Sequence, residues 1–174
     1  MHTNIRIAAI EDAAAICSVV RRSISECCGD DHHNNPELLE AWLKNKTVAN
    51  TEAWLSAPEN YAIVAEVDGS IVGFGLSQSE EILLCYIAPE VRHKGVGKSL
   101  LRAIEAHAAS AGIAELHLES TRTAEAFYRR NGFEPTGPVV VAFGMEGLPM
   151  SKRVVAHPSF QPTAAAELQH QADA

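Results

Sequence analysis

The segment RHKGVGKSLL, residues 92–101, places two glycines among basic residues directly before an expected helix. Glycines let the backbone adopt positive φ, and the free amides at a helix N-terminus attract anions. Lys98 falls in the first turn of that helix, where a cation is unfavourable unless an anion lies nearby. A solvated, charged helix start is the alternative, but it leaves the glycines unexplained. The segment therefore predicts a backbone cradle for a phosphate-type group.

The same segment ends like a nucleotide-binding phosphate loop, G-x-x-x-x-G-K-[ST], at Gly97, Lys98 and Ser99. That motif also requires a glycine five residues before Gly97, where this chain has Arg92. The strand LHLES offers Glu119 as a magnesium ligand, but the missing glycine weighs against a nucleoside triphosphatase. The G-x-G-x-x-G pattern of a dinucleotide site is absent here too. We therefore expect a different phosphorylated ligand.

Three other groups of residues could do chemistry. Tyr128 lies on an expected helix, where a core aromatic residue is the alternative interpretation. Glu80 and Glu81 open an expected strand, and at most one of them can face a cleft, because neighbouring strand residues point to opposite faces. The segment DDHH, residues 30–33, suggests metal ligation, but no third ligand has suitable spacing. We expect a plain loop there and no metal.

The composition narrows the class of protein. The chain has 174 residues, 47% of them hydrophobic, which suits one globular domain. Its net charge of -8 argues against generic nucleic-acid binding, and no apolar run approaches the ~20 residues that span a bilayer. Acidic residues inside the apolar N-terminal stretch argue against a secretory signal. The four cysteines form no C-x-x-C pair, so we expect a reducing cytoplasm without a disulfide framework or structural zinc.

Hydrophobic periodicity and turn residues predict a mixed sheet covered by helices, with a hairpin turn at Asp68-Gly69-Ser70 and an N-cap at Asn35 before Pro36. Strands are expected at residues 4–10, 61–67, 71–78, 81–89, 113–120, 137–145 and 150–155. Helices are expected at 11–28, 36–45, 51–57, from the cradle to Gly112, and at 123–131. The run 81–89 is nearly continuous in apolar residues, which predicts a central strand buried on both faces. Residues 1–155 form the expected domain, and 156–174 an expected flexible tail.

Two motifs, in this order, resemble the GCN5-related N-acetyltransferase (GNAT) family. The first, [RQ]-x-x-G-x-[GA] after a strand that ends in x-P, is matched by Pro89, Arg92, Gly95 and Gly97. The second, A-x-x-F-Y-x-x-x-G-F, is matched by Ala124, Phe127, Tyr128, Gly132 and Phe133. The N-terminal third of the chain resembles the family only in outline. The resemblance implies the α/β (α+β) GNAT fold, with a mostly antiparallel central sheet of about six to seven strands flanked by helices.

The resemblance also implies acetyl-coenzyme A as co-substrate and assigns roles to residues. The pyrophosphate would lie on the amides of 92–98, and the pantetheine arm would pair with 85–87 along the splayed central strand. Tyr128 would protonate the leaving thiolate, Glu81 would be the general base, and the oxyanion would be held by an amide near Tyr86. The coenzyme-binding residues implied are Cys85, Tyr86, Ile87, Arg92, His93, Lys94, Gly95, Val96, Gly97, Lys98, Ser120, Thr123 and Tyr128. Thr123 stands where many family members have Asn, and Ser120 could substitute for it.

The function implied is an N-acetyltransferase that acts on a primary amine of a small molecule, peptide or protein by direct attack in a ternary complex. A non-catalytic acyl-coenzyme A sensor is the alternative, since the cradle alone would bind the coenzyme. Acidic residues near the acceptor side mildly favour a cationic acceptor. The sequence does not reveal the acceptor. It does not fix the oligomeric state either, although family members often pair as homodimers.

Overall fold

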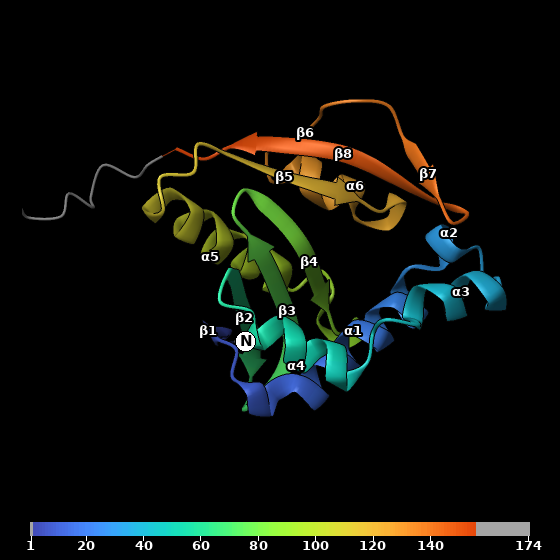
Figure 1. Ribbon diagram of the computed structural model, residues 1–174, viewed down its shortest axis with the longest axis horizontal. Helices are drawn as coiled ribbons and strands as arrows, with labels where there is room; N and C mark the ends of the chain where they lie inside the picture. The colour runs from blue at the N-terminus through green and yellow to red at the C-terminus, as the bar shows by residue number, and fades with distance from the viewer. Residues whose placement is uncertain (1, 156–174) are drawn as a thin grey trace, which may run out of the picture.

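The computed structural model describes residues 2–155, so the expected tail at 156–174 lies outside the described residues (Figure 1). The helical elements are η1 (Ile10–Asp12), α1 (Ala13–Cys27), α2 (Gly29–His32), α3 (Pro36–Leu43), α4 (Val48–Ser56), η2 (Pro89–Val91), α5 (Val96–Ser110) and α6 (Arg122–Arg130). The strands are β1 (Asn4–Ile7), β2 (Asn60–Val67), β3 (Ser70–Gln78), β4 (Glu81–Ile87), β5 (Glu115–Ser120), β6 (Glu134–Pro135), β7 (Val140–Ala142) and β8 (Met145–Arg153). No helix in this part of the chain is long and apolar enough to cross a membrane.

The strands form one mixed sheet in the order β1-β2-β3-β4-β5-β8-β6, with β7 paired to β8. Every strand pair is antiparallel except β4 with β5, which confirms the expected mostly antiparallel sheet. The parallel pair meets only at Glu81 and His117, and beyond that point β4 and β5 separate (Figure 1). The sheet therefore consists of two arms joined at one end.

Local sequence explains several element boundaries. Asp68 and Gly69 both have positive φ, which is the backbone of a tight hairpin turn between β2 and β3. The Asn35 side chain accepts hydrogen bonds from the amides of Glu37 and Leu38, so the expected N-cap of α3 is confirmed. The Thr47 hydroxyl caps α4, which therefore begins at Val48, before the expected start at residue 51.

Three expectations about local structure were wrong. In β4 only Ile82 is buried, whereas β3 is buried along most of its length, because separation from β5 leaves one side of β4 open. The expected strand 137–145 is interrupted by a turn at Phe143 and Gly144, both with positive φ, that joins β7 to β8. The segment 30–33 is not a plain loop, since residues up to His32 form α2.

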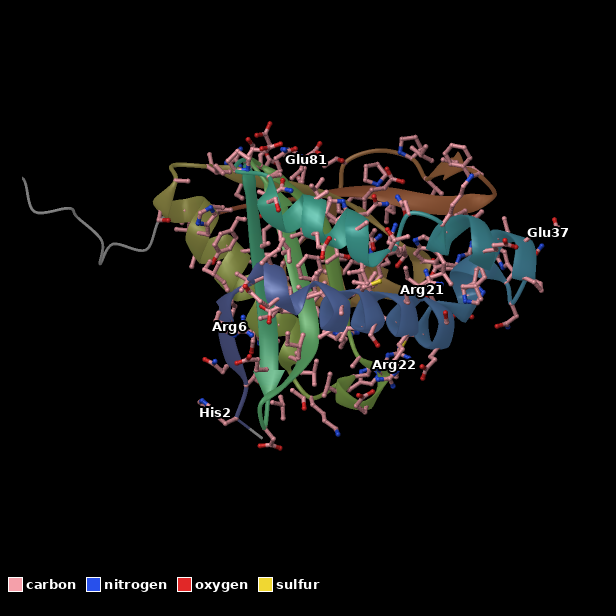
Figure 2. The ribbon with its side chains drawn as sticks, turned by 60° about the horizontal axis from the view of Figure 1, so that its bottom comes forward. His2, Arg6, Arg21, Arg22, Glu37 and Glu81 are labelled. Carbon is pink, nitrogen blue, oxygen red and sulfur yellow. The ribbon has the colours of Figure 1, made fainter. Side chains whose placement is uncertain are left out.

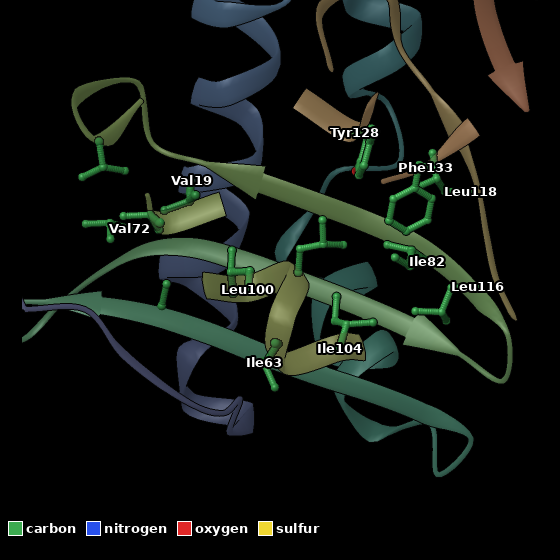
Figure 3. Packing of buried hydrophobic residues seen from close by; sticks show 14 of the residues in the cluster. Val19, Ile63, Val72, Ile82, Leu100, Ile104, Leu116, Leu118, Tyr128 and Phe133 are labelled. Atoms are coloured by element: carbon green, nitrogen blue, oxygen red, sulfur yellow. The ribbon is translucent and has the colours of Figure 1, made fainter. Parts of the chain in front are cut away.

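Helices α5 and α1 cover opposite faces of the first arm. Leu100 and Ile104 of α5 pack with Ile63 of β2 in one core cluster (Figure 3). Ile16, Val20 and Ile24 of α1 pack against the other face of β2 and β3. The approach of α5 requires glycine in β3. A Cβ at Gly73 would lie 3.0 Å from Leu100 Cδ1, and one at Gly75 would lie 3.2 Å from Ile104 Cδ1. This close packing fixes the N-terminus of α5 relative to the open side of β4.

Candidate functional site

A cavity of about 940 Å³ lies where β4 and β5 separate, and is called the large cavity below. It is lined by β4, the segment before α5, the C-terminal half of β5, α6 and the last turn of α1. Except for α1, these elements come from the middle or the C-terminal half of the chain. The separation of β4 from β5 places them around one cavity. The cavity is large enough for an extended cofactor.

The N-terminus of α5 forms the expected cradle at one end of the large cavity. Gly95 is the N-cap residue with a φ of 87°, and no side chain caps the helix. The first backbone bond of the helix runs from the Ser99 amide to the Gly95 carbonyl, 3.0 Å away. The amides of residues 96–98 therefore have no partner within the described chain. This is the arrangement that binds anions at helix N-termini.

Two amides of the expected cradle are already engaged. The Arg92 amide donates to the Pro89 carbonyl and the Lys94 amide to the Val91 carbonyl, each at 3.3 Å. The expectation that the whole backbone from residue 92 to 98 faces the ligand is therefore wrong for these two positions. Their bonds belong to the turn that follows η2, which sets the entry angle of the chain into α5.

Contacts with α1 and α6 hold this turn in place. The Arg22 guanidinium of α1, visible in Figure 2, donates to the Glu90 carboxylate at 2.9 Å, and the pair is largely exposed. An exposed pair of this kind stabilises the turn only weakly, because solvent screens the two charges. On the other side, a Cβ at Gly97 would lie 3.4 Å from the Phe127 ring. The cradle thus packs directly against α6, which carries Tyr128 next to Phe127.

The edge of β4 that faces the gap offers unpaired backbone groups. The Ala88 amide donates to Val72 of β3 at 2.8 Å, and pairing alternates along an antiparallel ladder. The Tyr86 amide therefore points to β3, whereas Cys85 and Ile87 direct their backbone groups to the gap. An oxyanion donor at Tyr86 itself is excluded by this alternation, and its two neighbours are the available donors.

Tyr128 projects from α6 into the core beside the gap (Figure 3) and has 7% of its surface exposed. Burial, and secondarily the neighbouring Cys85, raise the pKa of the Tyr128 phenol well above its usual value. Burial also raises the pKa of the Cys85 thiol to about 12. Both groups are thus protonated at neutral pH. The phenol can donate a proton, and the thiol is a poor nucleophile.

The N-terminus of α6, unlike that of α5, is fully capped. The Thr121 hydroxyl accepts from the Ala124 amide at 3.2 Å. The buried Asp31 carboxylate of α2 accepts from the Arg122 amide at 2.6 Å and from both the amide and the hydroxyl of Thr123. Thr123 lines the large cavity, but its hydroxyl proton is engaged by Asp31. Asp31 therefore connects the N-terminal helices to the helix that carries Tyr128.

A second cavity of about 280 Å³, called the small cavity below, adjoins the large one. It lies between α2, α3, β4, β5 and the β7–β8 hairpin, and the two cavities share Leu83, Leu84, Tyr86, Glu119 and Thr121 in their walls. Leu83 occupies a bulge of β4, where the register with β3 shifts. The two cavities therefore meet along the open side of β4.

The structure brings most of the expected site residues together. Cys85, Tyr86, Ile87, Arg92, His93, Gly95, Gly97, Lys98, Thr123 and Tyr128 line the large cavity. Lys94, Val96, Ser120 and Glu81 do not. The Val96 side chain is fully buried in the core, although its amide is free. Ser120 faces the small cavity, and its hydroxyl donates to the Thr121 carbonyl at 2.8 Å.

Glu81 lines neither cavity. It lies at the rim of the molecule where β4 begins (Figure 2), at the one point where β4 still pairs with β5. Glu119 is the carboxylate that lines both cavities. The alternation of β5, with buried residues at 116, 118 and 120, places Glu119 on the opposite face and could have indicated it. Within residues 2–155, no His, Cys, Asp or Glu cluster could hold a metal ion.

Comparison with known proteins gives consistent matches. Residues 30–154 match the family model described as an acetyltransferase (GNAT) domain. An amino-acid acetyltransferase of Pseudomonas fluorescens is 30% identical over 132 residues, which are 76% of this chain and 28% of that protein. Its counterpart in Azotobacter vinelandii is 27% identical over 133 residues. The chain thus spans about 28% of the length of these curated relatives.

Solved structures give the same result for the fold. A GCN5-related N-acetyltransferase from Rhodopseudomonas palustris is 25% identical with a TM-score of 0.78, covering 88% of this chain and 96% of that one. The PaiA N-acetyltransferase of Thermoplasma acidophilum, in complex with coenzyme A, is 26% identical with a TM-score of 0.74, covering 88% and 99%. At 18% identity, aminoglycoside 6'-acetyltransferase type Ii shares the fold, with a TM-score of 0.68 over 89% of this chain and 99% of that one.

Proposed function

The chain belongs to the GNAT acetyltransferase family, and we propose that it transfers the acetyl group of acetyl-coenzyme A to a primary amine by direct attack in a ternary complex. The observation that carries the proposal is the large cavity, which has free helix amides at one end and a buried, protonated phenol beside an open strand edge at the other. The coenzyme in the PaiA complex supports the same kind of ligand for this cavity.

In this proposal the coenzyme follows the large cavity. Its pyrophosphate binds the free amides of 96–98, with the side chains of Arg92 and Lys98 at the same wall. The pantetheine amides pair with the backbone of Cys85 and Ile87 as an added strand would. The thioester then reaches the side of Tyr128, and the amides facing the gap are in place to stabilise the oxyanion.

The chemistry requires three proton transfers. The acceptor ammonium first gives a proton to a carboxylate, and the neutral nitrogen attacks the thioester carbon. The C–S bond breaks, and the thiolate takes the proton of Tyr128, whose raised pKa keeps the phenol protonated beforehand. The second proton of the new amide nitrogen restores the Tyr128 phenol, and the carboxylate gives the first proton to solvent, so that overall one proton is released. The raised pKa of Cys85 supports direct attack over an acetyl-cysteine intermediate.

We assign the carboxylate to Glu119 and not to Glu81. Glu119 lies in the wall shared by the two cavities, so it faces both the thioester side and the small cavity, where we place the acceptor. Glu81 lines neither cavity. Relatives named amino-acid acetyltransferases support an amine as the acceptor. A cytoplasmic location and a homodimer stay predictions.

The proposal is tested with purified protein, acetyl-coenzyme A and a panel of small primary amines, amino acids and peptides. Release of free thiol that depends on both substrates is the expected result, with mass spectrometry confirming the N-acetyl product. Calorimetry with coenzyme A provides the second measurement. Tight coenzyme binding without turnover on any amine would contradict the proposal and favour the acyl-coenzyme A sensor. Absence of coenzyme binding would contradict the cradle itself.

A further inference from the structure

Four charged side chains line the small cavity: Asp31, Lys46, Glu119 and Glu146. Two of the four have a partner within the described chain. The Asp31 carboxylate caps α6, and Glu146 forms an ion pair with Arg122. Within residues 2–155, no ion pair or side-chain hydrogen bond engages the Glu119 carboxylate, and no carboxylate lies within salt-bridge distance of the Lys46 ammonium. The cavity therefore presents one free anion and one free cation to a ligand.

Lys46 is held rigidly although it belongs to a loop between α3 and α4. Its amide donates to the Leu43 carbonyl at 3.0 Å, and its own carbonyl accepts from Arg21 Nη1 at 2.9 Å and from Cys17 Sγ at 3.4 Å. Its ammonium donates to Asn45 Oδ1, a neutral group, at 2.5 Å. The contacts from α1 thus anchor the backbone of Lys46 beside the cavity.

Burial of this lysine is unfavourable unless an anion joins it. Lys46 has only 8% of its surface exposed, and burial lowers the pKa of its ammonium group. A buried charge is normally paired, and breaking such a pair costs several times more than breaking a surface pair. The unmatched cation in the wall of a cavity therefore indicates a site for a carboxylate or another small anion.

Glu119 lies against β8, in the wall that the small cavity shares with the large one. A Cβ at position 147 would lie 1.8 Å from Glu119 Oε1, so the carboxylate lies directly over the backbone of Gly147 in β8. Any side chain at Gly147 would displace it. Glu119 lines both cavities, whereas Lys46 lines only the small one. The Glu119 carboxylate is thus nearer to the proposed thioester position than the Lys46 ammonium is.

We propose that the acceptor is a small amino acid or related molecule that carries a carboxylate as well as the primary amine. Its ammonium group lies at Glu119, where the nitrogen can reach the thioester, and its carboxylate lies at Lys46. The cavity volume of about 280 Å³ suits a molecule of this size and not a folded protein segment. The inference rests on the proposed function and adds the acceptor class to it.

The first experiment needs no variant. Acetyl transfer is measured with sets of acceptors that share one skeleton: the free amino acid, its carboxamide and the corresponding amine without the carboxyl group. We expect kcat/KM to be at least about tenfold higher for the free acid, mainly through KM. Transfer with equal kcat/KM for acid and carboxamide would overturn the carboxylate site while leaving the acetyltransferase activity intact. No transfer to any amine would instead contradict the proposed function.

A second experiment locates the carboxylate site at Lys46. The Lys46→Met variant keeps the length of the side chain but removes its charge, and is expected to lower kcat/KM for the acid to that of the carboxamide. Lys44→Met is the matched control, since Lys44 is exposed and lines neither cavity. Melting temperatures show that both variants are folded. A preference for the acid that survives in Lys46→Met would overturn the assignment.

Discussion

The N-termini of α5 and α6 make an instructive comparison, because both helices follow strands at the same gap in the sheet. At α5 no side chain caps the helix, and the amides of 96–98 are free at the wall of the large cavity. At α6 Thr121 accepts from Ala124, and Asp31 accepts from the two preceding amides. One N-terminus is left open for a ligand anion, whereas the other is filled by the protein's own carboxylate.

This difference separates two uses of the same physical property. A helix N-terminus favours a negative charge, whether that charge comes from a ligand or from a side chain. The open end of α5 is suited to binding, while the closed end of α6 is suited to holding Tyr128 in a fixed place. Three substitutions, each with a matched control, test this division of roles.

The largest effect is expected at Tyr128, the residue that the closed end of α6 positions. Tyr128→Phe removes the proton donor and should lower kcat by about 100-fold or more, while the Kd of coenzyme A changes little. Thiol-release kinetics and calorimetry measure the two quantities. Tyr61→Phe is the control, since the Tyr61 ring stacks on His107 and lines neither cavity. Unchanged turnover in Tyr128→Phe would remove Tyr128 from this role.

A smaller effect is expected when the open end of α5 is blocked. Gly95→Leu should weaken coenzyme A binding by roughly 10- to 100-fold, because the side chain and the shifted backbone take the anion's place. Gly112→Leu is a matched control: both glycines flank α5 and have positive φ, and a Cβ added at either would meet no atom within 4 Å. Strain should therefore lower the melting temperature of both variants similarly. Equal coenzyme affinity in the two variants would contradict the assignment of the α5 N-terminus as the coenzyme-binding cradle.

The smallest effect is expected at the closed end of α6. Asp31→Ala leaves the Arg122 and Thr123 amides without their acceptor and should lower the free energy of unfolding by about 1–2 kcal/mol. Urea unfolding measures this change. The neighbouring Asp30 makes no side-chain hydrogen bond in the described chain, so Asp30→Ala should change stability by less than about 0.5 kcal/mol. Equal losses of unfolding free energy in both variants would show that the Asp31 cap does not stabilise α6.

Much of the fold follows from local patterns. The Asp68–Gly69 hairpin and the Asn35 cap are where the sequence predicts them, because turn and capping residues act over a few positions. The interruption at Phe143 and Gly144 was missed, because the apolar run around it reads as one strand. The exposure of β4 was missed for a different reason, since the gap beside it depends on how far β5 pairs.

The candidate site likewise contains residues that the sequence predicts and residues that only the structure reveals. The cradle and Tyr128 lie in contiguous motifs and were predicted. Glu119 and Lys46 belong to no motif, and they face one cavity only because β5 and the loop after α3 meet there. The sequence predicts Asp31 in a plain loop, but its carboxylate accepts a hydrogen bond from the amide of a residue 91 positions later in the chain. Such contacts leave no periodic signal that a single sequence could reveal.

The sequence by itself determined the family, the order of the main elements and the open end of α5, because glycine spacing and helix periodicity act between near neighbours. The tertiary structure decided which carboxylate faces the reaction, which amides remain free and which lysine is buried without a counter-charge. These properties depend on desolvation and on hydrogen bonds between distant segments. Both arise only when the two arms of the sheet separate and the helices pack around the gap.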